Sequence, residues 1–83
     1  MKQGDIVERV VSYVTRQIVE DPDSVEVEVI DEGDEAVVAE VRTAKSDMGR
    51  VIGRRGRVAR AIRTVAGAAG DEEGVSVAVE FLD

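Results

Sequence analysis

The fold is decided by residues 47–63, which read Asp47-Met48-Gly49-Arg50-Val51-Ile52-Gly53-Arg54-Arg55-Gly56-Arg57-Val58-Ala59-Arg60-Ala61-Ile62-Arg63. Ser46 or Asp47 can cap a short helix that runs through Ile52. A turn at residues 53–56 interrupts it, and a second helix follows over residues 57–69, with Val58, Ala61, Ile62, Val65 and Ala69 on one face. Gly70 is placed to end this second helix. The stretch therefore predicts two helices joined by a sharp glycine turn.

A third helix is predicted before this stretch, over residues 5–20. Its apolar side chains recur at three- and four-residue spacing, at Ile6, Val7, Val10, Val11, Val14 and Ile18. Asp5 can cap its start. Pro22 cannot continue a helix and disfavours helical geometry in the residue before it, so we expect this helix to stop near Glu20.

Three strands are predicted from alternating apolar and polar residues. They cover residues 24–30, residues 35–42 after an acidic turn at 31–34, and residues 75–81 after another acidic turn at 71–74. The first two form a β-hairpin, and the second, being the more apolar, is expected in the middle of the sheet. A strand that reaches the next one through helices favours parallel pairing with the helices on one face. The order α-β-β-α-α-β therefore predicts an α+β fold, a two-layer α/β sandwich with a three-stranded mixed sheet.

Length and composition exclude several classes of function. The chain has 83 residues without cysteine or histidine, so we expect one domain over residues 1–83 with no disulfide, no Cys/His metal site and no histidine catalysis. Acidic residues such as Glu26, Glu28 and Glu40 alternate along strands as a solvated sheet face would, so we predict no enzyme and no cofactor. No apolar run is long enough for a membrane span, and the N-terminal residues lack the apolar stretch of a signal peptide. We therefore expect a cytoplasmic protein.

The charge of the chain is concentrated in one segment. The net charge of −7 argues against a nucleic-acid partner. However, residues 1–44 carry 4 basic and 12 acidic side chains, residues 45–63 carry 7 and 1, and residues 64–83 carry 0 and 5. The seven cations are Lys45, Arg50, Arg54, Arg55, Arg57, Arg60 and Arg63. Such a run can also form the solvent-exposed face of a helix and pair with acidic residues of the same chain. The residues around the run must therefore distinguish an anion-binding site from an ordinary helix surface.

The turn at residues 53–56, which we name the glycine loop, offers a place for a phosphate group. Two glycines let the backbone turn sharply and approach a ligand, and the helix that follows presents free N–H groups and a dipole that attract an anion. Arg54 and Arg55 can add charge-assisted contacts, and Arg57, Arg60 and Lys45 extend the positive track along a strand of nucleotides. Residues 67–70 repeat the glycine spacing without any cation, so spacing alone is not the evidence.

Apolar residues beside the glycine loop have two interpretations. Val51, Ile52 and Val58 could line a shallow groove for base edges, whereas core packing explains Ile52 and Val58 equally well.

The loop sequence Val51-Ile52-Gly53-Arg54-Arg55-Gly56-Arg57, placed between the helices of an α-β-β-α-α-β chain, resembles the loop of a type II KH domain, the prokaryotic form of this RNA-binding module. The run over residues 47–63 in a chain of this length is similar to the small bacterial KhpA proteins, and the resemblance covers essentially the whole chain. It implies a single KH domain that binds single-stranded RNA, with the family loop on Gly53, Arg54, Arg55 and Gly56. The RNA-binding residues are then Lys45, Ile52, Gly53, Arg54, Arg55, Gly56, Arg57 and Arg60.

The resemblance also implies partners and a cellular role. Proteins of this kind are RNA chaperones that form a homodimer or a complex with a larger KH protein, KhpB (also called Jag or EloR), and act in post-transcriptional regulation and in cell-envelope and cell-length homeostasis. Two features depart from the family pattern. Ala59 stands where many KH domains have isoleucine, which predicts a shallower base-binding groove. The acidic residues 71–73 and the strongly acidic hairpin are expected to narrow the surface open to RNA.

Two alternatives remain open from the sequence. The first is a helix-turn-helix DNA binder, because two short helices joined by a glycine-containing turn fit that description, although the strands count against it. The second is a protein interaction module, in which the arginines of the glycine loop meet an acidic surface, such as the hairpin of another copy.

Overall fold

The computed structural model describes residues 2–83 and confirms the predicted element order. The helices are α1 (Asp5–Ile18), α2 (Met48–Ile52) and α3 (Arg57–Glu73), and the strands are β1 (Glu26–Asp31), β2 (Ala36–Arg42) and β3 (Ser76–Leu82). Single 3-10 turns lie at Pro22–Ser24, Lys45–Asp47 and Arg54–Gly56. Within residues 2–83, no helix combines the length and the apolar character needed to cross a membrane.

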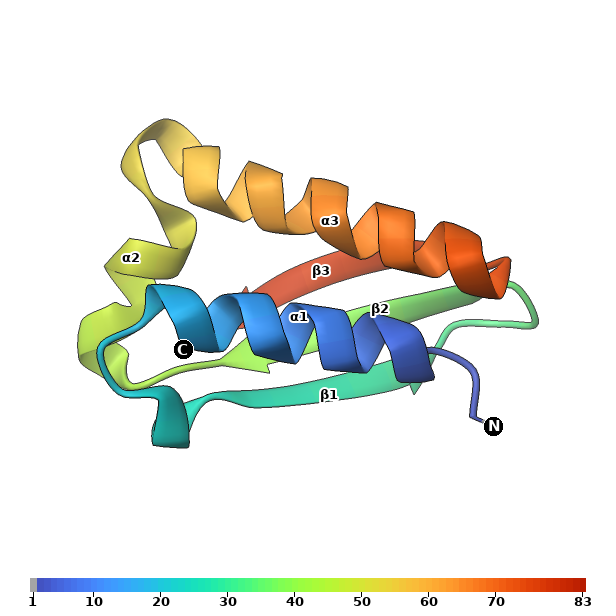
Figure 1. The fold of residues 1–83 in the computed structure, drawn as a ribbon, viewed down its shortest axis with the longest axis horizontal. Coiled ribbons are helices and arrows are strands. Elements are labelled where there is room, and N and C mark those ends of the chain that lie inside the picture. The colour runs from blue at the N-terminus through green and yellow to red at the C-terminus, as the bar shows by residue number, and fades with distance from the viewer. Residues whose placement is uncertain (1) are drawn as a thin grey trace.

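The sheet has the predicted topology, with β2 in the middle. β1 pairs antiparallel with β2, and β2 pairs parallel with β3, so that Val29, Ala39 and Val79 lie side by side across the three strands. The long helices α1 and α3 cover one face of this sheet, and α2 lies at one end (Figure 1). This arrangement is the predicted two-layer α/β sandwich, and it leaves the other sheet face open.

The core is built from small aliphatic side chains. Val7 and Val11 of α1 pack with Val37, Ala39 and Val41 of β2, with Ile62 and Ala66 of α3, and with several others. A core of this kind brings α3 close to the sheet, because alanine and glycine allow backbones to approach. At Gly70, an added Cβ would lie 2.6 Å from the carbonyl oxygen of Val75 and would also meet the side chain of Val77.

The predicted end of α3 was wrong. Gly70 does not stop the helix; α3 continues through the supposed turn at residues 71–73 and ends at Gly74, which adopts a left-handed conformation with φ 71°. Gly70 is needed for close packing against β3 and not for termination. The predicted buried face was also rotated, because Val65 is 41% exposed and Ala61 is exposed, whereas the buried side is formed by Ala59, Ile62, Ala66, Ala69 and Gly70.

The predicted helix caps were wrong as well, because carboxylates from distant residues hold the ends of α1. Asp5 makes no side-chain cap. Instead, the Glu73 carboxylate accepts hydrogen bonds from the backbone N–H groups of Gly4, Ile6 and Val7 at 2.9, 2.9 and 3.0 Å. The extra turn of α3 is what places Glu73 there.

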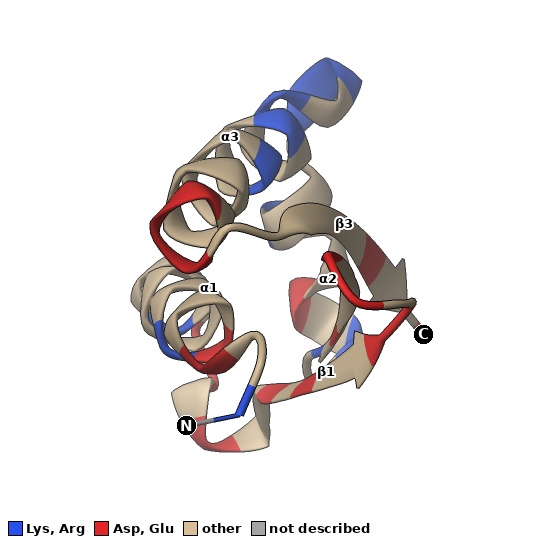
Figure 2. Ribbon diagram, turned by 90° about the vertical axis from the view of Figure 1, so that its right-hand side faces the viewer, with Lys and Arg blue, Asp and Glu red and all other residues tan. Residues whose placement is uncertain are grey.

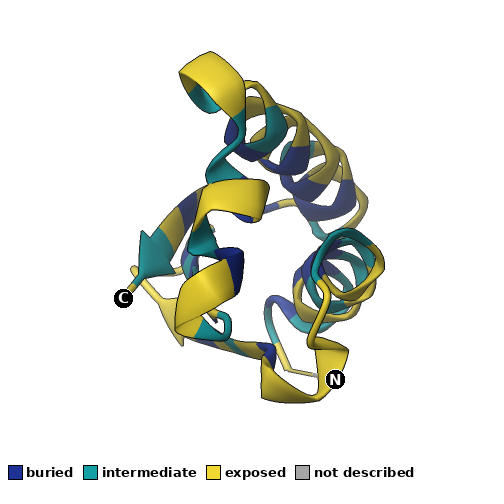
Figure 3. Cartoon of the chain, turned by 90° about the vertical axis from the view of Figure 1, so that its left-hand side faces the viewer, coloured by how far each residue is buried: buried dark blue, intermediate teal, exposed yellow. Residues whose placement is uncertain are grey.

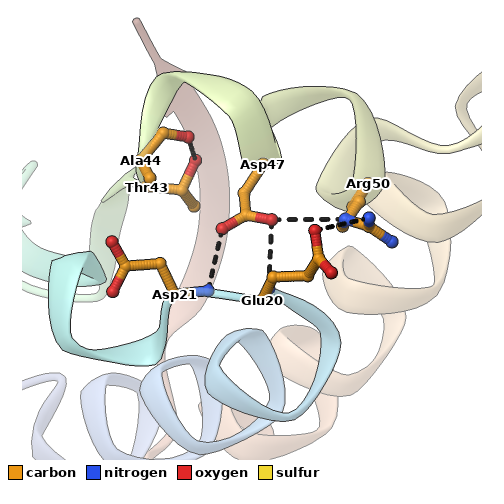
Figure 4. A network of polar contacts seen from close by, with 6 residues as sticks. All are labelled: Glu20, Asp21, Thr43, Ala44, Asp47 and Arg50. Atoms are coloured by element: carbon orange, nitrogen blue, oxygen red, sulfur yellow. Dashed lines mark hydrogen bonds and ion pairs between the residues drawn. The ribbon is translucent and has the colours of Figure 1, made fainter.

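At the other end of α1, the buried Asp47 side chain accepts from the backbone N–H groups of Glu20 and Asp21 at 3.0 and 3.1 Å (Figure 4). Asp47 therefore does not cap α2 as predicted, and neither does Ser46, since α2 has no side-chain cap. Instead, the Asp47 side chain holds residues 20 and 21, which follow α1, against the start of α2.

The hydrogen bonds to Glu73 affect its ionisation. Partial burial raises the pKa of the Glu73 carboxyl, but the N–H groups of Val7, Gly4, Ile6 and Asp5 together outweigh this effect and lower the pKa below its ordinary value of 4.5. A carboxyl with a lowered pKa in the folded state stabilises the fold above its unfolded-state pKa, and this contribution disappears as the pH falls through the lower folded-state value.

We predict that Glu73→Gln lowers the free energy of unfolding by about 1 kcal/mol near pH 7, the usual effect of losing a helix cap. The difference from the unmodified protein should shrink as the pH falls from about 4.5 downward, because protonation then removes the same charge from Glu73. Urea unfolding at several pH values measures both effects. Glu72→Gln is the control, since Glu72 is the exposed neighbour; equal effects of the two substitutions would contradict the assigned cap.

Candidate nucleic-acid interface

The glycine loop has an unusual backbone conformation. Gly53 ends α2 with φ 76°, Arg55 has φ 58°, and Gly56 has φ 72° and begins α3. Arg55 is the one non-glycine residue with positive φ among residues 2–83. Such a conformation costs on the order of 1 kcal/mol for a residue with a side chain, and strained residues of this kind cluster at functional sites.

The two glycines of the loop are required for different reasons. At Gly53 an added Cβ would lie 2.5 Å from Cγ2 of Val58 and 2.9 Å from the Val58 backbone nitrogen, so the loop folds tightly onto the first turn of α3. At Gly56 nothing lies within 4 Å of an added Cβ, so its positive φ is the whole requirement. Gly53 therefore allows the loop to pack against α3, and Gly56 allows the left-handed backbone turn that leads into α3.

At the start of α3, the backbone N–H groups of Gly56 and Arg57 donate to the carbonyls of Gly53 and Arg54 within the loop itself. No side chain caps this helix start, and no acidic residue lies in its first turn. The start of α1 has the same need for an acceptor, but Glu73 already satisfies it. Because free N–H groups and the helix dipole favour negative charge, the two N-termini differ in a simple way. One is filled by the protein's own carboxylate, and the other is surrounded by arginines.

Five of the seven cations are available at this end of the molecule. Arg54, Arg55, Arg57 and Arg60 are exposed on the loop and on the first turns of α3, and Lys45 is exposed in the turn before α2. Within residues 2–83 none of the five takes part in an ion pair. The glycine loop projects from the body (Figure 3), and basic residues gather at that end of α3 (Figure 2).

Two cations of the basic segment are used inside the fold. Arg50 contacts Glu20 at 2.8 Å and Asp47 at 3.3 Å, so it completes the network around α2 (Figure 4). Arg63 donates to the backbone carbonyl of Val79 at 3.3 and 3.2 Å, and its guanidinium lies 5.3 Å from the centre of the Phe81 ring. The interpretation of the arginines as internal pairing partners therefore holds for Arg50 alone.

The structure separates the apolar candidates. Val51 is fully buried in the core, so its predicted place in a surface groove was wrong. Val58 is partly buried and packs against the core, and Ile52 is partly exposed at the base of the loop. Ala59 is 2% exposed and faces the core, so its small size does not shape an open groove as expected.

The acidic residues 71–73 do not flank the loop. They form the last turn of α3, which is 17 residues long, so about 24 Å of helix separates them from the glycine loop. Figure 2 shows the acidic and basic segments at opposite ends of α3. Any narrowing of the surface open to RNA by these residues therefore falls at the far end of α3 and not beside the loop.

Sequence reasoning placed the last strand at an edge of the sheet but missed the contact that Arg63 makes with it. β3 lies at the edge of the sheet, and Arg63 covers the carbonyl of Val79 there while stacking on Phe81. Edge strands offer unpaired backbone groups to ligands, and Arg63 covers one of them. The sequence did contain a signal for this contact, namely an arginine-rich helix followed by a strand that carries Phe81 near its end.

The fold and the loop together define a type II KH domain. A family model described as "KhpA/KhpB, KH domain" matches residues 8–81. Among similar proteins, "RNA-binding protein KhpA" of Borreliella burgdorferi is 41% identical over 73 residues, which is 88% of each chain. The protein of that name from Caldanaerobacter subterraneus subsp. tengcongensis is 42% identical over 72 residues, covering 87% of this chain and 95% of its own. The Aquifex aeolicus protein is 39% identical over 74 residues, covering 89% and 92%.

The chain therefore belongs to the KhpA/KhpB family of KH domains. This is a family of binding proteins and not of enzymes. Membership also removes the helix-turn-helix alternative, because α2, the glycine loop and α3 are parts of a KH domain packed on a sheet.

We predict that Gly53→Ala destabilises the protein by about 1–3 kcal/mol, because it combines positive φ with a contact against the backbone of α3. Gly49→Ala is a control four residues earlier, inside α2, with nothing within 4 Å of its added Cβ. It should be neutral or stabilising by up to about 1 kcal/mol, because alanine favours helix. Urea unfolding of both variants checks this; equal losses would contradict the tight packing assigned to Gly53.

Proposed function

We propose that this chain binds single-stranded RNA by its sugar-phosphate backbone at the glycine loop. The residues assigned to this role are Lys45, Ile52, Gly53, Arg54, Arg55, Gly56, Arg57 and Arg60. The observation that carries the proposal is an uncapped helix start, reached through a left-handed turn, with exposed arginines that make no ion pair within residues 2–83. A phosphate group satisfies both the backbone N–H groups and the arginine side chains.

The comparisons support the choice of RNA as the ligand. Relatives that share 39–42% identity carry the name "RNA-binding protein KhpA", and the alignments include nearly the whole chain. KH domains hold about four nucleotides by clamping the backbone at the glycine loop. In this chain the loop and the first turn of α3 provide the backbone contacts, and Ile52 provides apolar surface beside them.

The contact should be weak and tolerant of sequence. Phe81 is one of two aromatic residues, and Arg63 already lies over its ring, so base stacking contributes little at this end of the molecule. Such binding suits an RNA chaperone acting in the cytoplasm as a single KH unit. Pairing with a second copy or with a KhpB-type protein would raise avidity without new chemistry. Roles in post-transcriptional regulation and in cell-envelope and cell-length homeostasis are part of the same proposal.

We predict that Arg54→Asp/Arg55→Asp weakens binding of a single-stranded RNA of about eight nucleotides at least tenfold, because two charge-assisted contacts become repulsive. Fluorescence anisotropy at fixed salt measures the affinity. The unmodified protein should show log K falling with log salt at a slope of about −3 if about four phosphates are neutralised, and the variant should show a slope nearer −1.5. Lys2→Asp/Arg9→Asp has the same change in net charge near the start of α1, at the opposite end of the molecule from the loop (Figure 1), and should retain most of the affinity.

Other outcomes would overturn the proposal. Unchanged RNA binding with altered oligomerisation would make the loop a protein-docking element instead. Preference for duplex DNA over single-stranded RNA at one salt concentration would contradict the assigned ligand. In amide chemical-shift mapping, residues 53–57 should respond first, and a response confined to a remote face would also exclude the loop as the RNA site.

A further inference from the structure

The outer edge of β3 offers backbone groups to a ligand. Within residues 2–83, β3 pairs with β2 on one side only, and Ser76 donates to the carbonyl of Glu35 on that side. The backbone groups of successive strand residues point to alternate sides, so Val77, Val79 and Phe81 turn theirs away from β2. Groups on such an edge have no partner strand and can form hydrogen bonds with a ligand.

Arg63 occupies the middle of this edge. Its Nε and Nη2 atoms donate to the Val79 carbonyl oxygen at 3.3 and 3.2 Å, and its guanidinium lies 5.3 Å from the centre of the Phe81 ring. A guanidinium makes both contacts at once because it combines a fork of N–H donors with a flat face that stacks on aromatic rings. The group therefore fills the position from which a base could bond the Val79 carbonyl or stack on Phe81.

Arg63 is held differently from the other arginines near the start of α3. Arg57 and Arg60 are exposed and take part in no ion pair within residues 2–83, so they can meet phosphate groups. Arg63 is exposed too, but its guanidinium is bound to β3. Contacts of an exposed cation with one carbonyl and one ring are modest in strength. They can open, but a base has to compete with them.

Arg63 is near enough to the glycine loop to meet the same RNA. It follows Gly56 by seven residues, which is about 10.5 Å along α3, and KH domains hold about four nucleotides. α3 packs along β3 (Figure 1). A strand of RNA whose backbone is held by the loop and by Arg57 and Arg60 can therefore turn its bases toward the edge of β3.

We propose that Arg63 is a specificity-determining residue that keeps bases off the edge of β3. The inference rests on the RNA binding proposed for the glycine loop. In the unmodified protein the guanidinium has to leave the Val79 carbonyl and the Phe81 ring before a base binds there, so RNA is held by its backbone with little discrimination among bases. Removing the guanidinium frees a carbonyl, the neighbouring N–H groups and an aromatic face, which can recognise and stack bases.

Binding of three single-stranded RNA octamers, of adenylate, cytidylate and uridylate, tests the proposal by fluorescence anisotropy at one salt concentration. The unmodified protein should bind all three within about threefold of one another. Arg63→Ala should bind one of them about fivefold more tightly than the unmodified protein does, and should spread the three affinities about tenfold or more, because stacking and base-edge hydrogen bonds become available. This gain accompanies the loss of a positive charge, which phosphate binding alone does not allow.

Arg60→Ala is the matched control on the same helix. It should weaken binding of all three octamers alike and reduce the salt slope from about −3 to about −2, because a phosphate contact is lost, whereas Arg63→Ala should keep a slope of about −3. Arg63→Lys keeps the charge but lacks the fork and the flat face. Its spread of affinities should therefore lie between those of the unmodified protein and Arg63→Ala. Urea unfolding checks that all the variants are folded.

Three outcomes would overturn the proposal. If Arg63→Ala binds every octamer more weakly and with a shallower salt slope, Arg63 is a phosphate contact. Unchanged affinities with an unchanged spread would show that Arg63 does not restrict base binding, and so would a lysine variant indistinguishable from the unmodified protein. Failure of RNA binding at the loop looks different, because Arg54→Asp/Arg55→Asp then keeps the affinity of the unmodified protein, whatever the effect of Arg63→Ala.

Discussion

Two carboxylates from the second half of the chain fix the helix of the first half. Glu73 accepts three backbone N–H groups at the start of α1, and buried Asp47 accepts two just beyond its end. Each contact joins residues that lie far apart in sequence, so helix α1 is held between the start of α2 and the end of α3. The geometry of the glycine loop depends on these contacts, since α2 and α3 are the two helices that it joins.

The same physics explains why an external anion would choose α3. Every helix leaves its first N–H groups without partners inside the helix, and negative charge is stabilised there. In α1 the requirement is met internally by Glu73. In α3 the first turn has no acidic residue, and the chain instead places Arg54, Arg55 and Arg57 around it. A helix start that has no carboxylate of its own and is flanked by cations is therefore a candidate site for an external anion.

Alternation and spacing predicted the element order, the middle strand and the position of the glycine loop, because these follow from local patterns of apolar residues and glycine. The end of α3 could not be predicted in the same way. Gly70 looks like a helix stop in sequence, and only its contact with Val75 and Val77 shows that it is a packing residue. The caps on α1 were missed because their acceptors are 66 residues or more away for Glu73 and about 26 for Asp47. The face of α3 was misjudged because its many alanines allow more than one apolar side.

Net charge therefore describes this molecule poorly, because position decides what each charge does. The acidic side chains of the sheet lie in register on a face that repels a polyanion, and those of α3 lie about 24 Å of helix away from the loop. A nucleic acid that approaches the open sheet face or the end of α3 meets negative charge, whereas at the glycine loop it meets exposed arginines. If RNA binds at the loop as proposed, the acidic body acts together with the arginines, because it limits the orientations in which RNA can approach and so fixes the position of a contact that tolerates many sequences.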